Sequence, residues 1–204
     1  MTSCWRSCVR IELVQHTSMK GIEEAMKTSR RREKIDKIPY KLFSWGHWSV
    51  LEHSSMTVKI YGISRACSHQ LVRQRIGVTF TQESQRYFDP LTDPDWYVIP
   101  PKIADSVELK QKFIEAREQE AAEYRTYRDS GIAKEDARFC LSNACKTIIT
   151  WSFNMSSLIW FLEQRLKKGA QWEIRALAQE LYDLVMSIPD WAGFLEHWKP
   201  KSRR

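Results

Sequence analysis

Residues 70–87 are the most informative stretch of this chain and read Gln-Leu-Val-Arg-Gln-Arg-Ile-Gly-Val-Thr-Phe-Thr-Gln-Glu-Ser-Gln-Arg-Tyr. The stretch places three arginines, Arg73, Arg75 and Arg86, within fourteen positions, after the apolar anchor Leu71 and Val72. A guanidinium group binds a phosphate or a carboxylate through two parallel hydrogen bonds. Three such cations so close together would repel one another without an anion. The stretch therefore predicts a binding site for a phosphorylated ligand.

The composition favours one globular domain that binds anions. The chain has 204 residues, 43% of them hydrophobic, which suits a single domain over residues 1–204 with a sizeable core. The net charge of +7 favours nucleotides, phosphate cofactors or nucleic acid without choosing among them. Five cysteines without CxxC spacing favour a reduced, cytoplasmic setting. We find no signal-peptide pattern and no window apolar enough to span a bilayer, so no membrane partner is expected.

Hydrophobic periodicity predicts an α+β fold with few strands and several helices. Alternating residues predict strands at 9–14 and 55–63, and a β-branched and aromatic run predicts a strand at 145–153. Ser64 and Asn154 are expected to cap helices, and Gly77 is expected in a loop that follows the first of these. Helices are expected at 18–29, 35–45, 64–75, 103–129, from near 134, at 154–168 and at 172–187.

Arg165 is the most informative residue outside the first stretch. On the helix predicted after Asn154, it lies three or four positions from Phe161 and Leu162 and seven from Leu158, so it shares their apolar face. A buried charge without a partner is costly, and Arg165 therefore needs an acidic partner or a ligand. Periodicity alone leaves two structural alternatives open for Arg165. Its side chain could form a salt bridge with a buried carboxylate, or it could extend to the edge of the apolar face and reach solvent.

The segment Gly46–His53 places two histidines, a serine and a glutamate between a helix and a strand. His47 and His53 are six positions apart, which is not the same-face spacing of a metal-binding helix, and no metal is predicted. A loop that hydrogen-bonds a polar cofactor and a plain connecting loop fit equally well. Arg138 follows acidic residues in a short helix, and judged alone it is better explained by a surface ion pair.

Several motifs of phosphate binding and hydrolysis are absent from the sequence. It contains no GxSxG, no GxGxxG and no Walker loop. If phosphate is bound, arginine side chains bind it and not a glycine-rich loop.

In their order along residues 9–190, these motifs resemble the flavin-dependent thymidylate synthases. The family signature R-H-R-x-x-S-x-N-x-x-S-x-R, usually followed by Tyr, is matched at Arg73, Arg75, Ser84, Arg86 and Tyr87, with Gln70 upstream. The other matching pieces are Gly46–His53, Asp136-Ala137-Arg138, Asn154, and Arg165 followed by Gln171-Trp172-Glu173.

The sequence also departs from the family pattern. Gln74 stands in place of the signature histidine, and one additional residue separates Arg75 from Ser84. The remaining departures are Thr79 and Thr81 for Ser and Asn, and Ser156, Trp160 and Gly169 where many members carry Arg, Asn and His near the flavin.

The resemblance implies an α+β protomer with a central, mostly antiparallel sheet flanked by helices, assembled as a homotetramer with active sites at subunit interfaces. It implies reductive methylation of dUMP to dTMP, with methylenetetrahydrofolate as carbon donor, NADPH as reductant and FAD as hydride relay. The uridine nucleotide would be bound by Gln70, Gln82, Glu83, Ser84, Arg86, Arg138 and Arg165, and Arg165 would also be catalytic. FAD would be bound by Ser29, His47, Ser49, Glu52, Arg73, Gln74, Arg75, Ile76 and Asn154.

Two other functions are weighed against this one. The first is C5-methylation of UMP or a related uridine nucleotide for nucleoside-antibiotic biosynthesis, which depends on how the site treats the ribose 2′-hydroxyl. The second is binding of RNA or DNA without catalysis. It is disfavoured because the basic residues are dispersed and do not form a stripe with interleaved aromatic residues.

Overall fold

The chain forms two compact units whose segments interleave along the sequence. The computed structural model describes residues 9–35, 42 and 46–196. Unit 1 consists of the described residues within Met1–Val9, Tyr61–Gln70 and Gln82–Ile149. Unit 2 consists of those within Arg10–Ile60, Leu71–Thr81 and Thr150–Arg204. A single domain over residues 1–204 stays a prediction.

Four strands form one antiparallel sheet in the order β1-β2-β4-β3. Hydrogen bonds from Asn154 N to Gly77 O at 3.1 Å and from Glu83 N to Ile148 O at 2.8 Å show the antiparallel register of the last pair, because residue numbers rise along one strand as they fall along the other. This agrees with the α+β class and the mostly antiparallel sheet expected from sequence. The strands are β1 (Arg10–His16), β2 (Ser55–Ser64), β3 (Val78–Gln82) and β4 (Lys146–Asn154).

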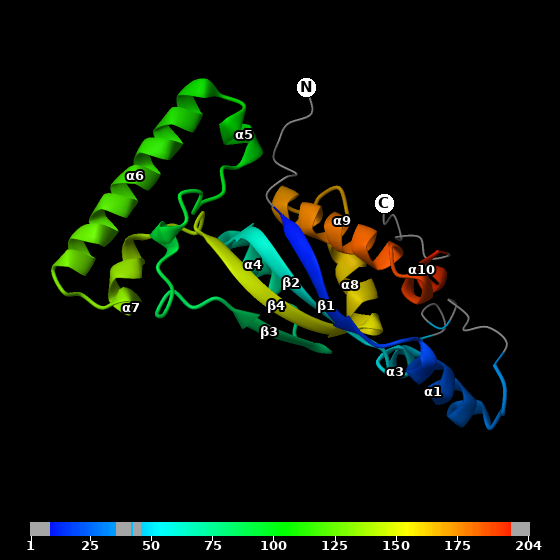
Figure 1. The fold of residues 1–204 in the computed structure, drawn as a ribbon. Coiled ribbons are helices and arrows are strands. Elements are labelled where there is room, and N and C mark those ends of the chain that lie inside the picture. Colours follow the sequence, from blue (N-terminus) through cyan, green and yellow to red (C-terminus); the bar gives the residue numbers. More distant parts are fainter. Residues whose placement is uncertain (1–8, 36–41, 43–45, 197–204) are drawn as a thin grey trace. The chain divides into compact units, whose positions relative to one another are not determined.

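Unit 2 is built on helices that pack against one another and against β1. Helix α9 contacts α8, α10 and β1, and α3 contacts both α1 and α8 (Figure 1). The helices are α1 (Lys20–Arg30), α3 (Trp48–Leu51), α8 (Met155–Arg165), α9 (Trp172–Met186) and α10 (Pro189–Leu195). One face of α9 is apolar at helical spacing and buried, and carries Ile174, Leu177, Leu181 and Val185.

The core of unit 2 is centred on Trp151 of β4. Its ring lies 5.9 Å from the Phe80 ring, 4.5 Å from that of Phe153 and 4.9 Å from that of Phe161, measured between centroids. These separations are typical of favourable aromatic pairs, each contributing about 0.5–1.5 kcal/mol beyond its burial. Because the four rings come from β3, β4 and α8, this cluster fixes α8 against the strands.

Unit 1 is built around the long helix α6 (Val107–Asp129), which contacts α5 (Pro101–Ala104), α7 (Lys134–Ala137) and the short helix η3 (Arg138–Cys140). It also holds most of α4 (Arg65–Leu71) and the short helix η2 (Pro90–Thr92). A small apolar cluster joins Trp96, Ala121 and the buried Cys145, with Leu91, Tyr97 and Leu141 around it. Burial raises the pKa of the Cys145 thiol to about 11, so this thiol stays protonated and unreactive at neutral pH.

Several elements differ from the sequence prediction, among them α10, which was not expected. The helix expected at 64–75 ends at Leu71, and the loop expected after it contains strand β3. The segment expected as a connecting loop before β2 contains one turn of helix, α3. The long helix expected from 103 is two helices, because Ser106 caps a new start by accepting a hydrogen bond from Leu109 N at 3.3 Å. The helix expected at 35–45 lies almost wholly outside the described residues.

None of the helices in the described ranges is long and apolar enough to cross a membrane.

Gly21 lets α1 approach the chain near α3 closely, and this contact gives a test of the packing in unit 2. A Cβ atom at Gly21 would lie 2.3 Å from the backbone oxygen of His53, far inside contact distance. We expect Gly21→Ala to reduce the free energy of unfolding by about 2 kcal/mol, because α1 must shift. The measurement is urea unfolding followed by circular dichroism.

The matched control is Gly193→Ala in α10, where a Cβ would meet nothing within 4 Å. Alanine has the higher helix propensity, so Gly193→Ala should be neutral or stabilising by up to about 1 kcal/mol. Equal effects of the two substitutions would contradict the close approach of α1.

Candidate functional site

The segment after β3 in unit 1 is held in place by its neighbours in that unit. The Gln82 amide nitrogen donates to the hydroxyls of Ser68 and Thr147, at 3.1 Å each. The backbone oxygen of Ser84 accepts from the nitrogens of Tyr87 and Phe88, both at 3.0 Å, which closes a turn. This turn presents the Ser84 hydroxyl and the exposed Arg86 side chain at the end of the strand.

Arg86 and Arg138, both predicted to bind phosphate, are bonded to the same residue. Arg86 Nε lies 2.6 Å from a carboxylate oxygen of Glu135, and Arg138 Nε donates to the Glu135 backbone oxygen at 3.0 Å. The Arg86–Glu135 pair is about half exposed, and such pairs contribute only about 0–1 kcal/mol. A phosphate carries more charge than a carboxylate. It can therefore replace Glu135 as the partner of Arg86 with little loss of free energy.

Arg65 is a third guanidinium group in this part of unit 1, and the sequence reasoning missed it. One of its terminal nitrogens donates to the Glu83 backbone oxygen at 3.1 Å, while its Nε is buried without a partner among the described residues. Burial lowers the pKa of Arg65 from its ordinary value, and the positive charge of Arg138 acts in the same direction. Arg65 thus adds positive charge next to the predicted phosphate ligands.

A cavity of about 540 Å³ lies in unit 2 and is called the α3–α8 cavity below. Five of the residues predicted to bind FAD line it, which are Glu52, Arg73, Gln74, Arg75 and Ile76. Its remaining lining residues are Trp48, Ser156, Ser157 and Trp160. Ser156 and Trp160 stand at positions that the resemblance places near the flavin, whereas Trp48 and Ser157 were not predicted. Trp48 and Trp160 are both partly exposed, and two indole rings and two guanidinium groups border this cavity.

Residues 74–77 are attached to the amino-terminal end of α8 by three hydrogen bonds. The Gln74 amide donates to Ser157 O at 2.9 Å, the Ser157 hydroxyl donates to Ile76 O at 2.7 Å, and Asn154 N donates to Gly77 O at 3.1 Å. Asn154 also caps α8, as its side-chain oxygen accepts from Ser157 N at 2.8 Å. Asn154 was predicted to bind FAD; in this structure its side chain caps the helix.

Ser29 and Ser49, also predicted to bind FAD, lie in a different hollow of unit 2. This groove of about 500 Å³ is called the α1–α3 groove, and it is lined by Gly21, Glu24, Ala25, Thr28, Ser29, Ser49, Val50 and His53. Trp48 and Glu52 line the α3–α8 cavity, whereas Ser49 and His53 line the groove. Each pair is four residues apart, so the single turn of α3 presents one pair to each hollow.

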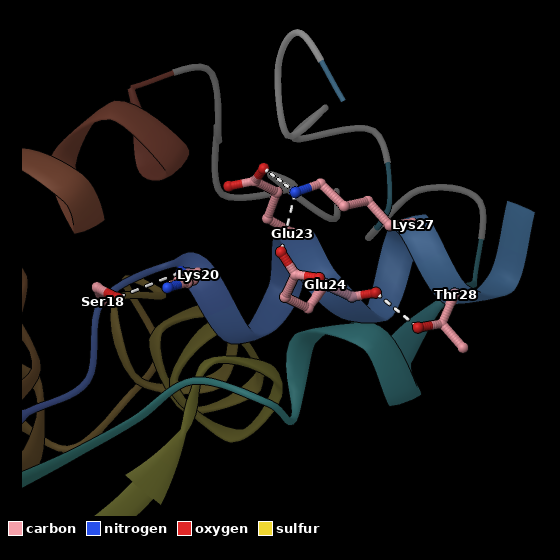
Figure 2. A network of polar contacts seen from close by, with 6 residues as sticks. All are labelled: Ser18, Lys20, Glu23, Glu24, Lys27 and Thr28. Carbon is pink, nitrogen blue, oxygen red and sulfur yellow. Dashed lines mark hydrogen bonds and ion pairs between the residues drawn. The ribbon is translucent and has the colours of Figure 1, made fainter. Parts of the chain in front are cut away.

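Helix α1 holds the acidic wall of this groove in ion pairs. Figure 2 shows Lys27 between Glu23, at 2.7 Å, and Glu24, at 2.9 Å, and the Thr28 hydroxyl donating to the Glu24 backbone oxygen. The hydrogen bonds that Lys27 donates to Glu23 and then to Glu24 raise the pKa of Lys27, so the lysine is charged throughout the physiological range. Lys27 thereby offsets part of the negative charge of Glu23 and Glu24 at the edge of the groove.

The remaining predicted residues line neither of these two hollows. His47 is exposed just before α3, and Gln70 is half-buried near the end of α4. Arg165 is half-buried at the last residue of α8, and its Nε is fully covered without a hydrogen-bond partner in the described part of the chain. The apolar-face placement inferred for Arg165 thus agrees with the structure, and this nitrogen retains its need for a partner. The roles assigned to all these residues stay predictions.

The fold and these residues define an α+β protein with two arginines on one glutamate in unit 1 and two further arginines on the wall of a cavity in unit 2. A family model described as thymidylate synthase complementing protein matches residues 4–189, and the chain belongs to that family.

Relatives of this chain are named flavin-dependent thymidylate synthases. One from Geobacter sulfurreducens is 46% identical over 148 residues, which are 72% of this chain and 63% of that protein. This chain therefore spans less than two thirds of that relative's length. One from Clostridium tetani is 37% identical over 184 residues, 82% of this chain and 72% of that protein. One from Saccharolobus solfataricus is 37% identical over 195 residues, 88% and 74% of the two chains.

A solved structure has the same fold. It is a UMP/dUMP methylase from Streptomyces cacaoi bound with 5-Br dUMP, with a TM-score of 0.80 and 22% sequence identity, covering 96% of this chain and 97% of that one.

Gly77 packs closely against the start of α8. It has a φ of +65°, and a Cβ there would lie 2.4 Å from the Ser157 hydroxyl oxygen and 2.5 Å from the Asn154 amide nitrogen. We expect Gly77→Ala to lower the free energy of unfolding by about 3 kcal/mol or more, since strain and overlap both act. The measurement is urea unfolding.

Gly131→Ala is the matched control, because Gly131 has a φ of +82° and a Cβ there would meet nothing within 4 Å. It should show only the backbone strain, about 1–2 kcal/mol. A Gly77→Ala protein no less stable than Gly131→Ala would show that residues 74–77 are not packed on α8 as described.

Proposed function

We propose that this protein is a flavin-dependent thymidylate synthase, which methylates C5 of dUMP to give dTMP. Methylenetetrahydrofolate would supply the carbon, NADPH the electrons, and FAD would be the bound flavin. The observation that carries the proposal is the α3–α8 cavity, because arginines from the signature stretch line it together with two tryptophans. The family and the names of the relatives support the same reaction.

The residues of the α3–α8 cavity suit a flavin dinucleotide. Indole rings such as Trp48 and Trp160 stack on planar heterocycles. Guanidinium groups such as Arg73 and Arg75 bind the oxygens of a pyrophosphate. A bound FAD would supply the hydride chemistry of the reaction, which no side chain of the protein can supply.

Arg86 and Arg138 are assigned to the nucleotide phosphate. Both already bind oxygen atoms of Glu135, so their guanidinium groups are directed to one place in unit 1. The Ser84 hydroxyl, at the start of the turn that carries Arg86, would add a neutral hydrogen bond. The backbone of Gln82 and Glu83, just before this turn, was also expected to help, but the Glu83 N–H is already bonded to Ile148 O at 2.8 Å. These groups would position the substrate, and they have no part in the chemical step.

Arg165 is assigned to the uracil ring. Methylation at C5 requires electron density on that carbon, and a guanidinium beside the ring would stabilise the negative charge that develops. Its covered Nε indicates a desolvated environment, where such a charge acts more strongly than in water. Arg165 would act only electrostatically, because a guanidinium does not lose its proton near neutral pH.

A second candidate substrate is UMP. The Streptomyces cacaoi structure of the same fold is named a UMP/dUMP methylase. The two substrates differ only in the ribose 2′-hydroxyl, and a site distinguishes them by whether it hydrogen-bonds or excludes that group.

The experiment that tests the proposal has two steps. The purified protein, supplied with FAD, should quench flavin fluorescence, and with methylenetetrahydrofolate and NADPH it should convert dUMP to dTMP. Turnover of dUMP and of UMP is compared in parallel, and the larger kcat/KM identifies the substrate. A protein that binds no flavin, or that turns over neither nucleotide, would refute the proposal.

The proposal includes a cytoplasmic homotetramer with active sites at its subunit interfaces. Large exposed hydrophobic side chains next to Arg86 and Arg138 in the sequence support an interface, since Tyr87 is 80% and Phe139 is 84% exposed. Light scattering of the purified protein gives the mass of the assembly directly.

Loss of the Arg86 guanidinium should weaken nucleotide binding. We expect Arg86→Ala to raise the dUMP dissociation constant by about tenfold or more, because a charge-assisted hydrogen bond to phosphate is lost. Isothermal titration calorimetry measures this constant. Arg125→Ala, which removes an exposed arginine from α6 of the same unit, is the control and should leave it within about twofold. If both variants weaken binding equally, Arg86 contributes only to the general charge.

Arg165→Ala should lower turnover far more than it weakens nucleotide binding. The reason is that the interaction with the uracil strengthens as negative charge develops in the transition state. Single-turnover kinetics gives the rate of the chemical step, and calorimetry gives the dUMP dissociation constant. Arg165→Lys keeps the charge and should recover part of the rate. An unchanged turnover in Arg165→Ala would exclude the catalytic role.

A further inference from the structure

We propose that Gln74 is a positioning residue, whose side-chain amide holds the signature arginines on either side of it at the wall of the α3–α8 cavity. The inference rests on the proposed function, because it concerns binding of the flavin. It goes further in assigning a role to the residue at which this chain departs from the family signature.

The orientation of the Gln74 amide follows from its partner. The atom 2.9 Å from Ser157 O must be the amide nitrogen, because a backbone carbonyl oxygen only accepts hydrogen bonds. The other end of the amide, Oε1, is buried and has no hydrogen-bond partner among the described residues. Leaving a buried acceptor unpaired costs free energy, so the glutamine is not optimal for stability here. The amide nitrogen is the part of the Gln74 side chain that contributes a hydrogen bond, the one to Ser157 O.

Burial of the Gln74 side chain determines that the side chains next to it in the sequence are exposed. Gln74 is 6% exposed, whereas Arg73, Arg75 and Ile76 around it are exposed, and all of them line the cavity. The bond to Ser157 holds the middle residue inward, so the flanking guanidinium groups remain outside. Without that bond, the segment keeps its two other attachments to α8, through Ile76 O and Gly77 O, both on the far side of Arg75.

The Gln74 amide also makes this attachment independent of pH. A side-chain amide does not titrate, whereas the histidine of the family signature changes its charge between about pH 5 and 8. The charged groups that line the same cavity are Arg73, Arg75 and Glu52, and the amino-terminal end of α8 adds partial positive charge. These groups surround the amide, and none of them replaces its hydrogen bond to Ser157.

The test compares flavin binding by two near-isosteric variants. Gln74→Met has no donor, and we expect it to bind FAD about fivefold more weakly than the wild-type protein at every pH. Gln74→Glu presents a carboxylate to Ser157 O at pH 8, where we expect FAD binding about tenfold weaker. At pH 5 burial and Glu52 favour the protonated acid, and Arg73, Arg75 and the amino-terminal end of α8 oppose it. The protonated form donates as the amide does, so the affinity should move from its value at pH 8 towards that of wild type. FAD fluorescence quenching gives the dissociation constants, with no turnover required.

Two controls accompany these variants. Gln119→Glu makes the same change in charge at an exposed position of α6 and should not alter FAD binding at either pH. Ser157→Ala removes the separate bond to Ile76 O and should also weaken FAD binding. Circular dichroism is recorded for each protein at both pH values.

The inference is overturned if Gln74→Met binds FAD within twofold of wild type, or if the affinity of Gln74→Glu relative to wild type is the same at pH 8 and pH 5. It is also overturned if either variant is unfolded at both pH values, since Gln74 then determines the fold and not the position of the arginines. A wild-type protein that binds no FAD would instead refute the proposed function, and with it this inference.

Discussion

The hydrogen bonds made by Ser157 are the interaction on which the described site depends most. Its backbone nitrogen is bonded to the cap of α8, its hydroxyl to Ile76 O, and its carbonyl to the Gln74 amide. Ser157 is buried, so each of these groups would be costly if left without a partner. Ser157 thus joins the start of α8 to the segment that carries Arg73 and Arg75. Ser157 and these two arginines line the same cavity.

Much of the fold could be predicted from the sequence. Strands β1 and β2 follow from alternating residues and β4 from a β-branched and aromatic run, and the Asn154 cap follows from residue type. Helices α8 and α9 were also expected close to where they lie. Strand β3 was missed although Val78, Phe80 and Gln82 alternate with exposed residues, because the arginines and Gly77 beside it were read as a loop. Short elements such as α3 and α10 leave too few residues for a periodic signal.

Residues of the candidate site could be predicted from the sequence only where the type of side chain itself indicates a ligand. Arginines close in sequence stand out, and the structure brings Arg86 and Arg138 to one glutamate and places Arg73 and Arg75 along one cavity. Arg65 was missed because its surroundings depend on contacts made across the fold. Arg65 bonds the backbone of Glu83, eighteen positions away, and no sequence pattern marks such a bond.

The interleaving of the two units has a consequence for synthesis on the ribosome. Unit 2 takes segments from Arg10–Ile60, Leu71–Thr81 and Thr150–Arg204, so its first third is translated long before its last. Trp151 and the apolar face of α9 must emerge before the early strands can bury their side chains. Burial of the apolar side chains of unit 2 therefore waits until its last segment has been made, and contacts between residues so far apart in the sequence slow folding.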